Sequence, residues 1–504
     1  MKVIAMYLPQ FHRVKENDEW WGEGFTDWTT VKNAKSLYTG HEQPHIPLDD
    51  NYYDLMDKKT MIWQSELMKK YNVDGMCIYH YWFKNSRKIL EKPAENLLQW
   101  TDIDMPFCFC WANQTWARSW SNIKLKNSWA NTFENEPREE ESGVLLEQRY
   151  GAQRQWEEHF NYLLPFFKDS RYITIDGKPV FTIYRSAEIN CIKEMLELWR
   201  ELAVENGLKG LYVIGMQEEQ RGDKILDAEL YHEPVRAAKI VRPQVLDSVA
   251  RRSYDAVWNN ILETKVKGKV YFGGFVSYDD TPRMGMEGGV IEGARPDKFR
   301  QYMTELMAKN EAYGNNIVFL NAWNEWGEGM HLEPDTCHKY GYLEAVSYAK
   351  EHYQDHVAYY RKHAEISAQE RDELVGIKAH VDKFEHYLNI LDFWMNLREN
   401  GVKLENWFIE NDYRNIGLYG YGVLGKHLLR ELEESSIIVS YLVDRQKNSL
   451  RAALPMYLPE DSLPEADLIV VSATFYYDDI YRQLKNNGVK NIVSLEYIMR
   501  EMYL

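Results

Sequence analysis

The sequence predicts an α/β protein: a (β/α)8 TIM barrel followed by a helical connector and a small Rossmann-like α/β domain. Three observations predict this architecture. Eight short apolar runs, mostly separated by helical patterns, occupy about the first 340 residues. Most of these runs end in His, Trp, Tyr, Asn, Asp or Glu, as expected where a barrel keeps its active site. Near residue 420 a glycine motif follows a strand and opens a helix.

The predicted barrel strands are short apolar runs between helical patterns. In chain order they are Val3–Leu8, Met76–Tyr79, Pro106–Cys110, Lys178–Ile183, Leu211–Gly215, Leu226–Tyr231, Lys269–Val276 and Ile317–Leu320. The predicted helices include Met61–Tyr71, Arg154–Phe167, Glu188–Asn206, Arg252–Thr264 and Asp297–Glu311. A long loop rich in Trp, Gly and His is expected after the first strand. The alternative fold, an open doubly wound sheet, predicts a glycine-rich phosphate loop there, but Leu8-Pro9-Gln10-Phe11-His12 is not one.

Three domains are expected: the barrel over residues 1–350, the helical connector over 351–410, and the Rossmann-like domain over 411–504. The connector is highly charged, and the apolar residues of Val381–Leu397 are expected to pack against a domain. In the last domain, strand Asn415–Tyr419 leads into the motif Gly420-Tyr421-Gly422-Val423-Leu424-Gly425. A helix, a second strand (Ile438–Val443) and Asp444 follow in the order of a dinucleotide fingerprint.

The glycine motif leaves two interpretations open. Gly420, Gly422, Gly425 and Asp444 are candidate cofactor-binding residues for a nucleotide. A structural or partner-docking domain is the alternative, because the unit has only about half the length of a dinucleotide fold. Little regular structure is expected after the next strand, Leu468–Val471.

Composition limits the classes of partner. The formal net charge of −17 disfavours nucleic acid and anionic membranes. The 17 Trp and 35 Tyr favour carbohydrate, because sugar rings stack on aromatic side chains. No apolar stretch approaches the roughly 20 residues of a membrane span. Five cysteines without framework spacing fit a reduced, cytoplasmic enzyme. The oligomeric state stays open.

The strongest candidates for catalysis are Glu325 and Glu328, which follow the eighth strand within a Trp- and Gly-rich segment. If the chain turns helically after Trp323, the Cβ atoms of residues three apart lie roughly 5–6 Å from each other. This separation suits a carboxylate pair acting on one sugar carbon. No metal site is predicted, because His41 and His45 lack the spacing of a metal motif.

Residues beyond the strand ends and in the aromatic loops are the candidates for substrate binding. They are His12, Trp20, Trp28, His80, Tyr81, Trp82, Asn113, Trp116, Tyr184, Glu233, Asp279, Asp280, Arg283, Trp323, Asn324, Trp326 and Glu333. Core packing is the alternative for Trp20, Trp28 and Trp116. A structural ion pair is the alternative for Asp279 and Arg283.

Ordered motifs over roughly residues 3–350 resemble the WbsX-like family, relatives of glycoside hydrolase family 99 (endo-α-mannosidases and endo-mannanases). They include Tyr7-Leu8-Pro9-Gln10-Phe11-His12, Glu16-Asn17-Asp18-Glu19-Trp20-Trp21-Gly22, Gly24-Phe25-Thr26-Asp27-Trp28, His80-Tyr81-Trp82-Phe83, Cys110-Trp111-Ala112-Asn113, Gly177-Lys178-Pro179-Val180, Asp280-Thr281-Pro282-Arg283, Asn321-Ala322-Trp323-Asn324-Glu325-Trp326-Gly327-Glu328-Gly329 and Leu332-Glu333-Pro334-Asp335. Gln114 stands where many WbsX-like sequences have Glu. The C-terminal unit resembles the small Rossmann-like domains of some bacterial surface-glycan enzymes.

The resemblance implies a (β/α)8 barrel and a retaining, metal-independent glycoside hydrolase that acts on α-linked glycans, mannose-type or bacterial surface polysaccharides. It implies that Glu325 deprotonates the sugar 2-hydroxyl, forming a 1,2-anhydro sugar, and that Glu328 is the acid/base. Trp323 and Trp326 are expected to desolvate Glu328. The alternative is a glycosyltransferase of O-antigen or capsular polysaccharide biosynthesis. A non-catalytic glycan-binding protein is less favoured, because binding alone gains nothing from two repelling carboxylates.

Overall fold

The computed structural model describes residues 1–117, 144–216, 225–246, 249–266, 268–363, 368–433, 435–447 and 451–502. The chain divides into two compact units, Met1–Ile366 and Ser367–Leu504. The helices α13 (Gln354–His363) and α14 (Ala368–Glu399), both within the range predicted as a connector, fall on either side of this division. Among the described residues, no helix is long and apolar enough to cross a membrane.

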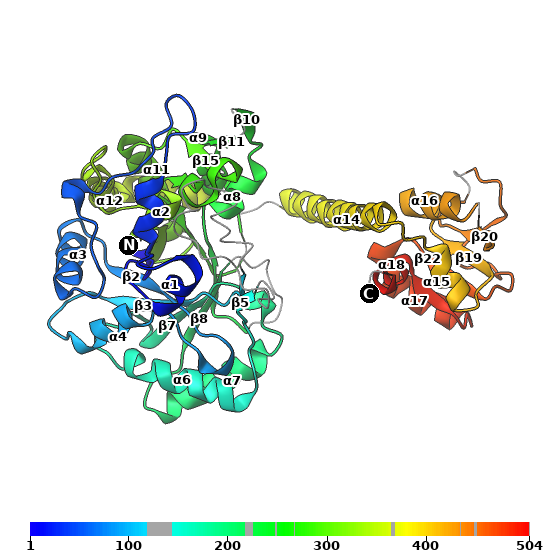
Figure 1. Cartoon of the computed structure of the whole chain (residues 1–504), viewed down its shortest axis with the longest axis horizontal. Coiled ribbons are helices and arrows are strands. Elements are labelled where there is room, and N and C mark those ends of the chain that lie inside the picture. Colours follow the sequence, from blue (N-terminus) through cyan, green and yellow to red (C-terminus); the bar gives the residue numbers. More distant parts are fainter. Residues whose placement is uncertain are drawn as a thin grey trace. The chain divides into compact units, whose positions relative to one another are not determined.

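The first unit is a parallel barrel surrounded by helices (Figure 1). Its strands pair in the order β12-β9-β8-β7-β3-β2-β1-β16-β13. Their bounds are β1 Lys2–Tyr7, β2 Gly75–His80, β3 Phe107–Trp111, β7 Lys178–Ile183, β8 Tyr212–Met216, β9 Ala228–Tyr231, β12 Val270–Phe272, β13 Gly274–Phe275 and β16 Ile317–Asn321. These ranges confirm the predicted fold class, with strand ends that differ by one or two residues from the prediction for most strands.

The barrel closes through its seventh strand, which is interrupted at Gly273. On one side of this residue β12 pairs with β9, and on the other side β13 pairs with β16. A Cβ atom at Gly273 would lie 2.4 Å from the carbonyl oxygen of Tyr231, so only glycine fits without movement of the backbone. The predicted single strand Lys269–Val276 is therefore two short strands that together complete an eight-stranded barrel.

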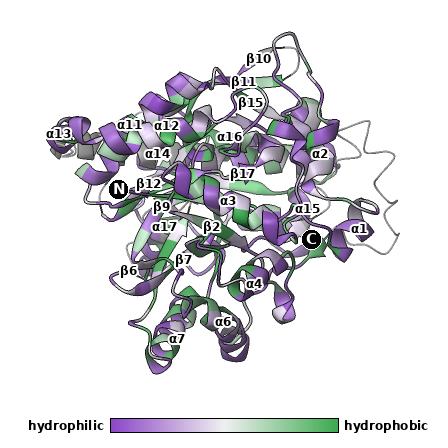
Figure 2. Ribbon diagram, turned by 90° about the vertical axis from the view of Figure 1, so that its left-hand side faces the viewer, coloured by the Kyte–Doolittle hydropathy of each residue, from purple (hydrophilic) through white to green (hydrophobic). Residues whose placement is uncertain are grey.

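Helices cover the outside of the barrel. They are α3 Lys58–Lys70, α4 Lys92–Gln99, α6 Gln153–Phe167, α7 Ile192–Glu205, α8 Val235–Ile240, α9 Tyr254–Glu263, α11 Pro296–Ala312 and α12 Gly341–His352. Helices such as α6 and α7 carry both hydrophilic and hydrophobic stretches (Figure 2). Their buried residues, for example Phe160 and Leu163 on α6 and Leu196 and Trp199 on α7, belong to one large core with the strands. This pattern is expected of amphipathic helices that pack one face on a sheet.

Shorter elements form the carboxyl-terminal face of the barrel. They are α1 Lys15–Trp21, α2 Asp27–Asn33, β4 Trp116–Ala117, β5 Val144–Leu146, β10 Gln244–Leu246, β11 Val249–Ser253, β14 Tyr278–Asp279, α10 Thr281–Met284, β15 Gly289–Glu292, β17 Asn324–Glu325 and β18 Met330–His331; β6 (Thr174–Ile175) pairs with β7. The segment predicted as one long loop after the first strand thus contains the two helices α1 and α2. Its aromatic residues form these helices and the hydrophobic contacts beneath them.

The second unit contains a five-stranded parallel sheet with the order β21-β20-β19-β22-β23. Its elements are α15 Glu405–Glu410, β19 Asn415–Tyr419, α16 Val423–Leu432, β20 Ile438–Val443, β21 Met456–Tyr457, β22 Leu468–Val471, α17 Tyr477–Asn486, β23 Ile492–Ser494 and α18 Leu495–Glu501. The expectation of little structure after Leu468–Val471 was wrong, because two helices and a strand follow it. Helix α14 contributes Ile390, Trp394 and Leu397 to this unit's core, as predicted for Val381–Leu397.

Candidate active site

The barrel carries a cavity of about 380 Å³ at the carboxyl ends of its strands. Loops after at least six strands contribute to it, as in other (β/α)8 barrels. Its lining residues are Leu8, Gln10, Asn17, Trp21, Phe25, Asp27, Thr30, Tyr79, Tyr81, Ala112, Gln114, Trp116, Tyr184, His232, Pro234, Val235, Asp280, Arg283, Met284, Asn321, Glu325, Glu328 and Met330. Both candidate catalytic glutamates are among them, together with five of the predicted substrate-binding residues: Tyr81, Trp116, Tyr184, Asp280 and Arg283.

One guanidinium joins three carboxylates in this cavity. Arg283 donates from Nη2 to Glu325 Oε1 at 2.6 Å and from Nη1 to Glu328 Oε1 at 2.7 Å. Nη2 also contacts both carboxylate oxygens of Asp27 at 3.1 Å. The two glutamates are therefore close together, because they bind neighbouring nitrogens of one planar fork. If all four groups are ionised, the cluster has an excess of negative charge.

Burial of Glu325 determines the electrostatics of the cluster. It raises the pKa of Glu325 to about 8, and the negative charges of Glu328 and Asp27 act in the same direction. The Arg283 guanidinium opposes this rise, and the three carboxylates in turn raise the pKa of Arg283. The side chain of Glu325 is 8% exposed, whereas that of Glu328 is 32% exposed. The first glutamate is thus desolvated, and the second faces the open part of the cavity.

Gly327 makes room for this arrangement. A Cβ atom at Gly327 would lie 2.6 Å from Arg283 Nε and 2.9 Å from Asp27 Oδ2. Both distances are far below van der Waals contact, so a larger residue would displace the guanidinium from its carboxylates. Glycine between the two glutamates is therefore a steric requirement of the cluster.

The backbone around the glutamates differs from the predicted helical turn. Asn324 and Glu325 form β17, which pairs with β18, and a single 3₁₀ turn over Trp326–Glu328 connects them. Gly329 ends that turn in the left-handed conformation, with φ of 67°. The helical geometry thus begins at Trp326. A β-hairpin, fixed by strand pairing, presents the two carboxylates.

Glu333 anchors this hairpin through hydrogen bonds. Its buried carboxylate accepts hydrogen bonds at 2.8–2.9 Å from the indole nitrogens of Trp323 and Trp326, from Gln64 and from the hydroxyl of Tyr53. Burial raises the pKa of Glu333 to about 7 in spite of these donors. The indole N–H groups of Trp323 and Trp326 point to Glu333, and neither residue lines the cavity, so the expected desolvation of Glu328 by these tryptophans has no support here.

Asn324 attaches the same hairpin to the first strand. Its side-chain oxygen accepts from the amide of Leu8 at 2.7 Å, and its nitrogen donates to the carbonyl of Leu8 at 3.0 Å. The side chain therefore pairs with the backbone as a strand would. Like Glu333, Trp323 and Trp326, Asn324 lies outside the cavity lining and positions the glutamates.

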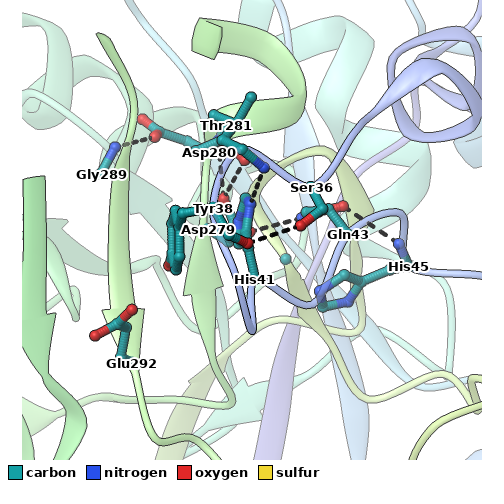
Figure 3. Close-up of polar contacts among 12 residues, drawn as sticks. Ser36, Tyr38, His41, Gln43, His45, Asp279, Asp280, Thr281, Gly289 and Glu292 are labelled. Carbon is teal, nitrogen blue, oxygen red and sulfur yellow. Dashed lines mark hydrogen bonds and ion pairs between the residues drawn. The ribbon is translucent and has the colours of Figure 1, made fainter. Parts of the chain in front are cut away.

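Two neighbouring aspartates have different surroundings (Figure 3). Asp279 Oδ2 lies 2.7 Å from His41 Nε2 and 2.7 Å from Gln43 Nε2, and Oδ1 accepts from Thr281. These hydrogen bonds lower the pKa of Asp279 and anchor the loop that contains His41. Asp280 lines the cavity and accepts from the amide of Gly289 at 2.6 Å. Burial raises its pKa to about 6.

Strand alternation separates the predicted residues on β2 and just beyond it. Tyr79 and Tyr81 line the cavity, whereas His80 points outward and its Nε2 lies 2.8 Å from the Nε2 of His159. Trp82 stacks on the ring of His159 at 4.4 Å. Successive side chains of a strand face opposite sides of the sheet. Because Tyr79 faces the cavity, His80 must face away from it.

Five further candidates lie outside the cavity lining. Asn113 bonds to the backbone of Arg185, and Glu233 accepts from Arg236 and from the amide of Ala237. Trp28 donates to the carbonyl of Tyr53 within the core, and Trp20 contacts Trp116 edge to face at 6.1 Å. The fifth, His12, is buried, and its ring nitrogens make no side-chain hydrogen bond within the described residues.

Sequence reasoning missed several lining residues that carry polar groups. Asp27 belongs to the motif Gly24-Phe25-Thr26-Asp27-Trp28 and lines the cavity, whereas the sequence pattern favoured its neighbour Trp28. Asn321 and His232 interact through their side chains at 2.8 Å, and Tyr79 lies 3.3 Å from His232. Alternation along the strands was the available signal for Tyr79 and Asn321. With its amide oxygen turned toward Arg185, Gln114 accepts two hydrogen bonds at 2.5 and 2.9 Å.

Two groups of side chains on the barrel's loops have the ligand types of a metal site. Within the described residues they are Glu42, Cys337 and His338, and His45, His331 and Asp335. In the second group His331 Nε2 lies 3.1 Å from Asp335 Oδ2, and the ring of His331 stacks on Trp326 at 3.7 Å. A hydrogen-bonded His–Asp pair that supports the hairpin accounts for this contact.

The closed parallel barrel with a buried carboxylate–arginine cluster at its carboxyl-terminal face has the form of a (β/α)8 enzyme. The chain belongs to the family described as Glycosyltransferase WbsX, whose family model matches residues 3–346.

Relatives are found among curated proteins and solved structures. The uncharacterized protein WxcX of Xanthomonas campestris pv. campestris (strain B100) is 29% identical over 369 residues, which cover 69% of this chain and 49% of that protein. The chain thus spans about half the length of the curated relatives it matches. The endo-α-mannosidase of glycoside hydrolase family 99 from Bacteroides thetaiotaomicron is 13% identical, with a TM-score of 0.42, over 71% of this chain and 98% of that one. That likeness carries no conclusion about activity.

Proposed function

We propose that the barrel is a retaining, metal-independent glycoside hydrolase for α-linked glycans, of mannose type or from bacterial surface polysaccharides. The observation that carries this proposal is the Arg283 cluster, in which two glutamates that line the cavity share one guanidinium. Neighbouring carboxylates of different exposure suit a base and an acid acting on one sugar carbon. The aromatic lining residues Trp21, Tyr81 and Trp116 suit the flat faces of sugar rings.

In the first step, Glu325 takes the proton of the sugar 2-hydroxyl. The freed oxygen attacks C1 of the same sugar, and the bond from C1 to the leaving oxygen breaks. Glu328 donates its proton to that oxygen, so the leaving sugar departs neutral and a 1,2-anhydro sugar remains. The electron pair of the new C1–O2 bond comes from the substrate, and no enzyme atom becomes covalently attached.

In the second step, Glu328 takes a proton from water, and the water oxygen attacks C1. The C1–O2 bond breaks, and O2 regains a proton from Glu325. Two inversions at C1 give net retention. The greater exposure of Glu328 supports its role, because the leaving sugar and the incoming water both need access to it.

The raised pKa of Glu325 supports its role as the base. A carboxylate with a pKa of about 8 binds a proton far more strongly than an ordinary glutamate. It is therefore a stronger base once it is ionised. General bases work best when their pKa lies near the working pH. Arg283 keeps the ionised form accessible by opposing the effect of burial.

A glycosyltransferase is the second candidate, favoured by the description of the family. A metal-dependent transferase needs acidic residues that hold a nucleotide sugar at the active face. The Asp102-Ile103-Asp104 sequence lies before β3, at the amino end of the strand, and its aspartates pair with Lys58 and Lys69 on the outside. This placement favours the hydrolase.

The test is an activity screen of the wild-type protein beside Glu325→Gln and Glu328→Gln, on α-linked mannans and bacterial surface glycans. Each glycan is offered with and without nucleotide sugars, and NMR identifies the anomer formed first. The proposal expects release of an α-anomer without nucleotide, reduced by about 10²-fold or more in each variant. Transfer seen only with a nucleotide sugar, or activity indifferent to both substitutions, contradicts it. Asp102→Asn is the matched control.

A further inference from the structure

The second unit has a cavity at the reversal point of its sheet. Its strands in chain order, β19 to β23, occupy the spatial order 3-2-1-4-5, so the order reverses between β19 and β22. Open parallel α/β sheets bind ligands outside the carboxyl ends of the strands at such a point. A cavity of about 530 Å³ lies there, lined by Tyr419, Gly420, Asp444 and Ser472 among others.

The three glycines of the motif have three different steric roles. Gly420 has φ of 94°, which a glycine adopts without strain. A Cβ atom at Gly425 would lie 2.0 Å from the carbonyl oxygen of Gly420, so helix α16 can start here only with glycine. A Cβ atom at Gly422 would meet nothing within 4 Å. The backbone conformation thus explains Gly420, and the close packing of the helix on the loop explains Gly425. Gly422 has neither role and leaves open space in front of the helix.

These roles match the glycines of dinucleotide-binding loops, in which the second glycine lets the backbone approach a pyrophosphate. Helix α16 begins at Val423, and Gly422 is its N-cap residue. Amide groups in the first turn of a helix have no partner within the helix and attract anions. Open space at Gly422 therefore lies where phosphate groups would meet this helix.

Side chains around the cavity offer contacts for the rest of a nucleotide. Asp444, at the end of β20, accepts from the amides of Tyr421 at 2.7 Å and Gln446 at 2.8 Å, one bond to each oxygen. A carboxylate has about four acceptor positions, so ribose hydroxyls can still bind. The hydroxyl of Tyr419 is buried at the cavity, and the Arg445 guanidinium lies beside it.

Helix α14 contributes a further wall within the same unit. Lys383, Phe384 and Tyr387 line the cavity, and Phe384 is 70% exposed. An exposed aromatic ring beside a polar cavity suits stacking on a planar base. The positive charges of Lys383 and Arg445 compensate the negative charges of Asp444 and Asp479, and all four residues line the cavity.

We propose that the second unit binds a ligand carrying a nucleoside diphosphate group, with the diphosphate on the first turn of α16 at Gly422 and the ribose on Asp444. A free nucleoside diphosphate, a nucleotide sugar and a dinucleotide share this chemistry. The site is separate from the glycan cavity of the barrel and does not depend on the hydrolase assignment.

The test is isothermal titration calorimetry of the full chain with ADP, UDP, GDP, UDP-glucose, GDP-mannose and NAD⁺, with inorganic phosphate as a further ligand. Binding of at least one nucleotide with Kd below 1 mM is expected, at least tenfold tighter than phosphate. Free nucleoside diphosphates, nucleotide sugars and dinucleotides are compared by affinity. The class that binds most tightly identifies the kind of ligand that carries the diphosphate group. Gly422→Val is expected to weaken binding about 30-fold or more, because its side chain occupies the open space.

Asp444→Ala is expected to weaken binding about tenfold through loss of the ribose contact. Should Gly422→Val fail to fold, this second variant decides the matter. Asp412→Ala, an exposed aspartate outside the cavity, serves as control and keeps its affinity. Both cavity variants keep the barrel's glycan activity, so failure of one proposal is distinguishable from failure of the other. Absence of nucleotide binding, equal affinity for phosphate, or unchanged affinity in both cavity variants overturns the proposal.

Discussion

The two units both place a cavity at the carboxyl ends of parallel strands, yet they line it differently. In the barrel, charged side chains converge, and Arg283 alone contacts Asp27, Glu325 and Glu328. In the second unit the phosphate-facing part is backbone, shaped by Gly420, Gly422 and Gly425. A site that carries out proton transfer needs side chains with shifted pKa values. A site that only holds a phosphate needs amide groups and space.

This difference predicts different sensitivity to substitution. The barrel's cluster combines burial with mutual charge compensation, so removal of one charge leaves others buried and unpaired. In the second unit a single charged side chain can be lost with little effect on folding, because the sheet and its glycines define the cavity. Paired substitutions in the two cavities test this comparison directly.

The largest effect is expected from Arg283→Met. Loss of the guanidinium leaves the Asp27, Glu325 and Glu328 carboxylates without their common cation. Glycan activity is expected to fall about 10²–10³-fold, and unfolding free energy by about 3–5 kcal/mol. Activity assays and thermal unfolding measure both. The matched variant Arg445→Met, in the second cavity and exposed, is expected to leave both quantities unchanged; equal effects of the two substitutions would remove the contrast between the sites.

A smaller effect is expected from adding one methyl group. In Gly327→Ala the new Cβ lies 2.6 Å from Arg283 Nε, so the guanidinium must move away from its carboxylates. Overpacking of this kind costs about 1–3 kcal/mol, and glycan activity is expected to fall roughly 10–50-fold. In Gly422→Ala the methyl group enters open space, and thermal stability is expected to stay the same. Full activity in Gly327→Ala would show that the cluster tolerates displacement of Arg283.

The pH dependence of the barrel tests the ionisation of Glu325. As the base, Glu325 must be ionised while Glu328 is protonated, so kcat/KM is expected to follow a bell-shaped pH profile with one limb near pH 8 that reports Glu325. Asp27→Asn removes a negative charge that raises the pKa of Glu325. The limb near pH 8 is therefore expected to move to lower pH, by up to about one unit. Asp412→Asn in the second unit is the control. A wild-type profile without a limb near pH 8 would contradict the raised pKa of Glu325.

Sequence patterns were sufficient for the fold class and for the barrel strands because these depend on local periodicity, but they missed α17, β23 and α18 at the end of the chain. The apolar runs located all eight barrel strands, and the glycine motif located β19 and α16. The interruption at Gly273 was not predictable from periodicity, because it arises from the close approach of the Tyr231 carbonyl on a strand distant in sequence. Long-range contacts of this kind leave no local pattern.

The candidate site was predictable in part, for a physical reason. Glu325 and Glu328 stand out through their spacing and neighbours, and Arg283 through its motif. The pairs Tyr79 and His80, and Asp279 and Asp280, look alike as sequence, yet only one member of each lines the cavity. Strand direction and the twist of the loops decide which member faces inward. Glu333 accepts four hydrogen bonds, and the donors come from three separate segments of the chain. Only the folded chain brings these segments together.

The smallest effect is expected from chelation, which contrasts the barrel's proton chemistry with metal-assisted hydrolysis. In the proposed steps, Arg283 supplies the positive charge near the reacting groups, and both protons move through glutamates. His331 is already paired with Asp335 and stacked on Trp326. Prolonged dialysis against EDTA is therefore expected to change glycan activity less than about twofold, in an assay where mutation of a general acid or base costs about 10²-fold or more. A loss that added zinc or manganese reverses, and that His45→Ala reproduces, would instead make His45, His331 and Asp335 a functional metal site and would replace the two-glutamate mechanism.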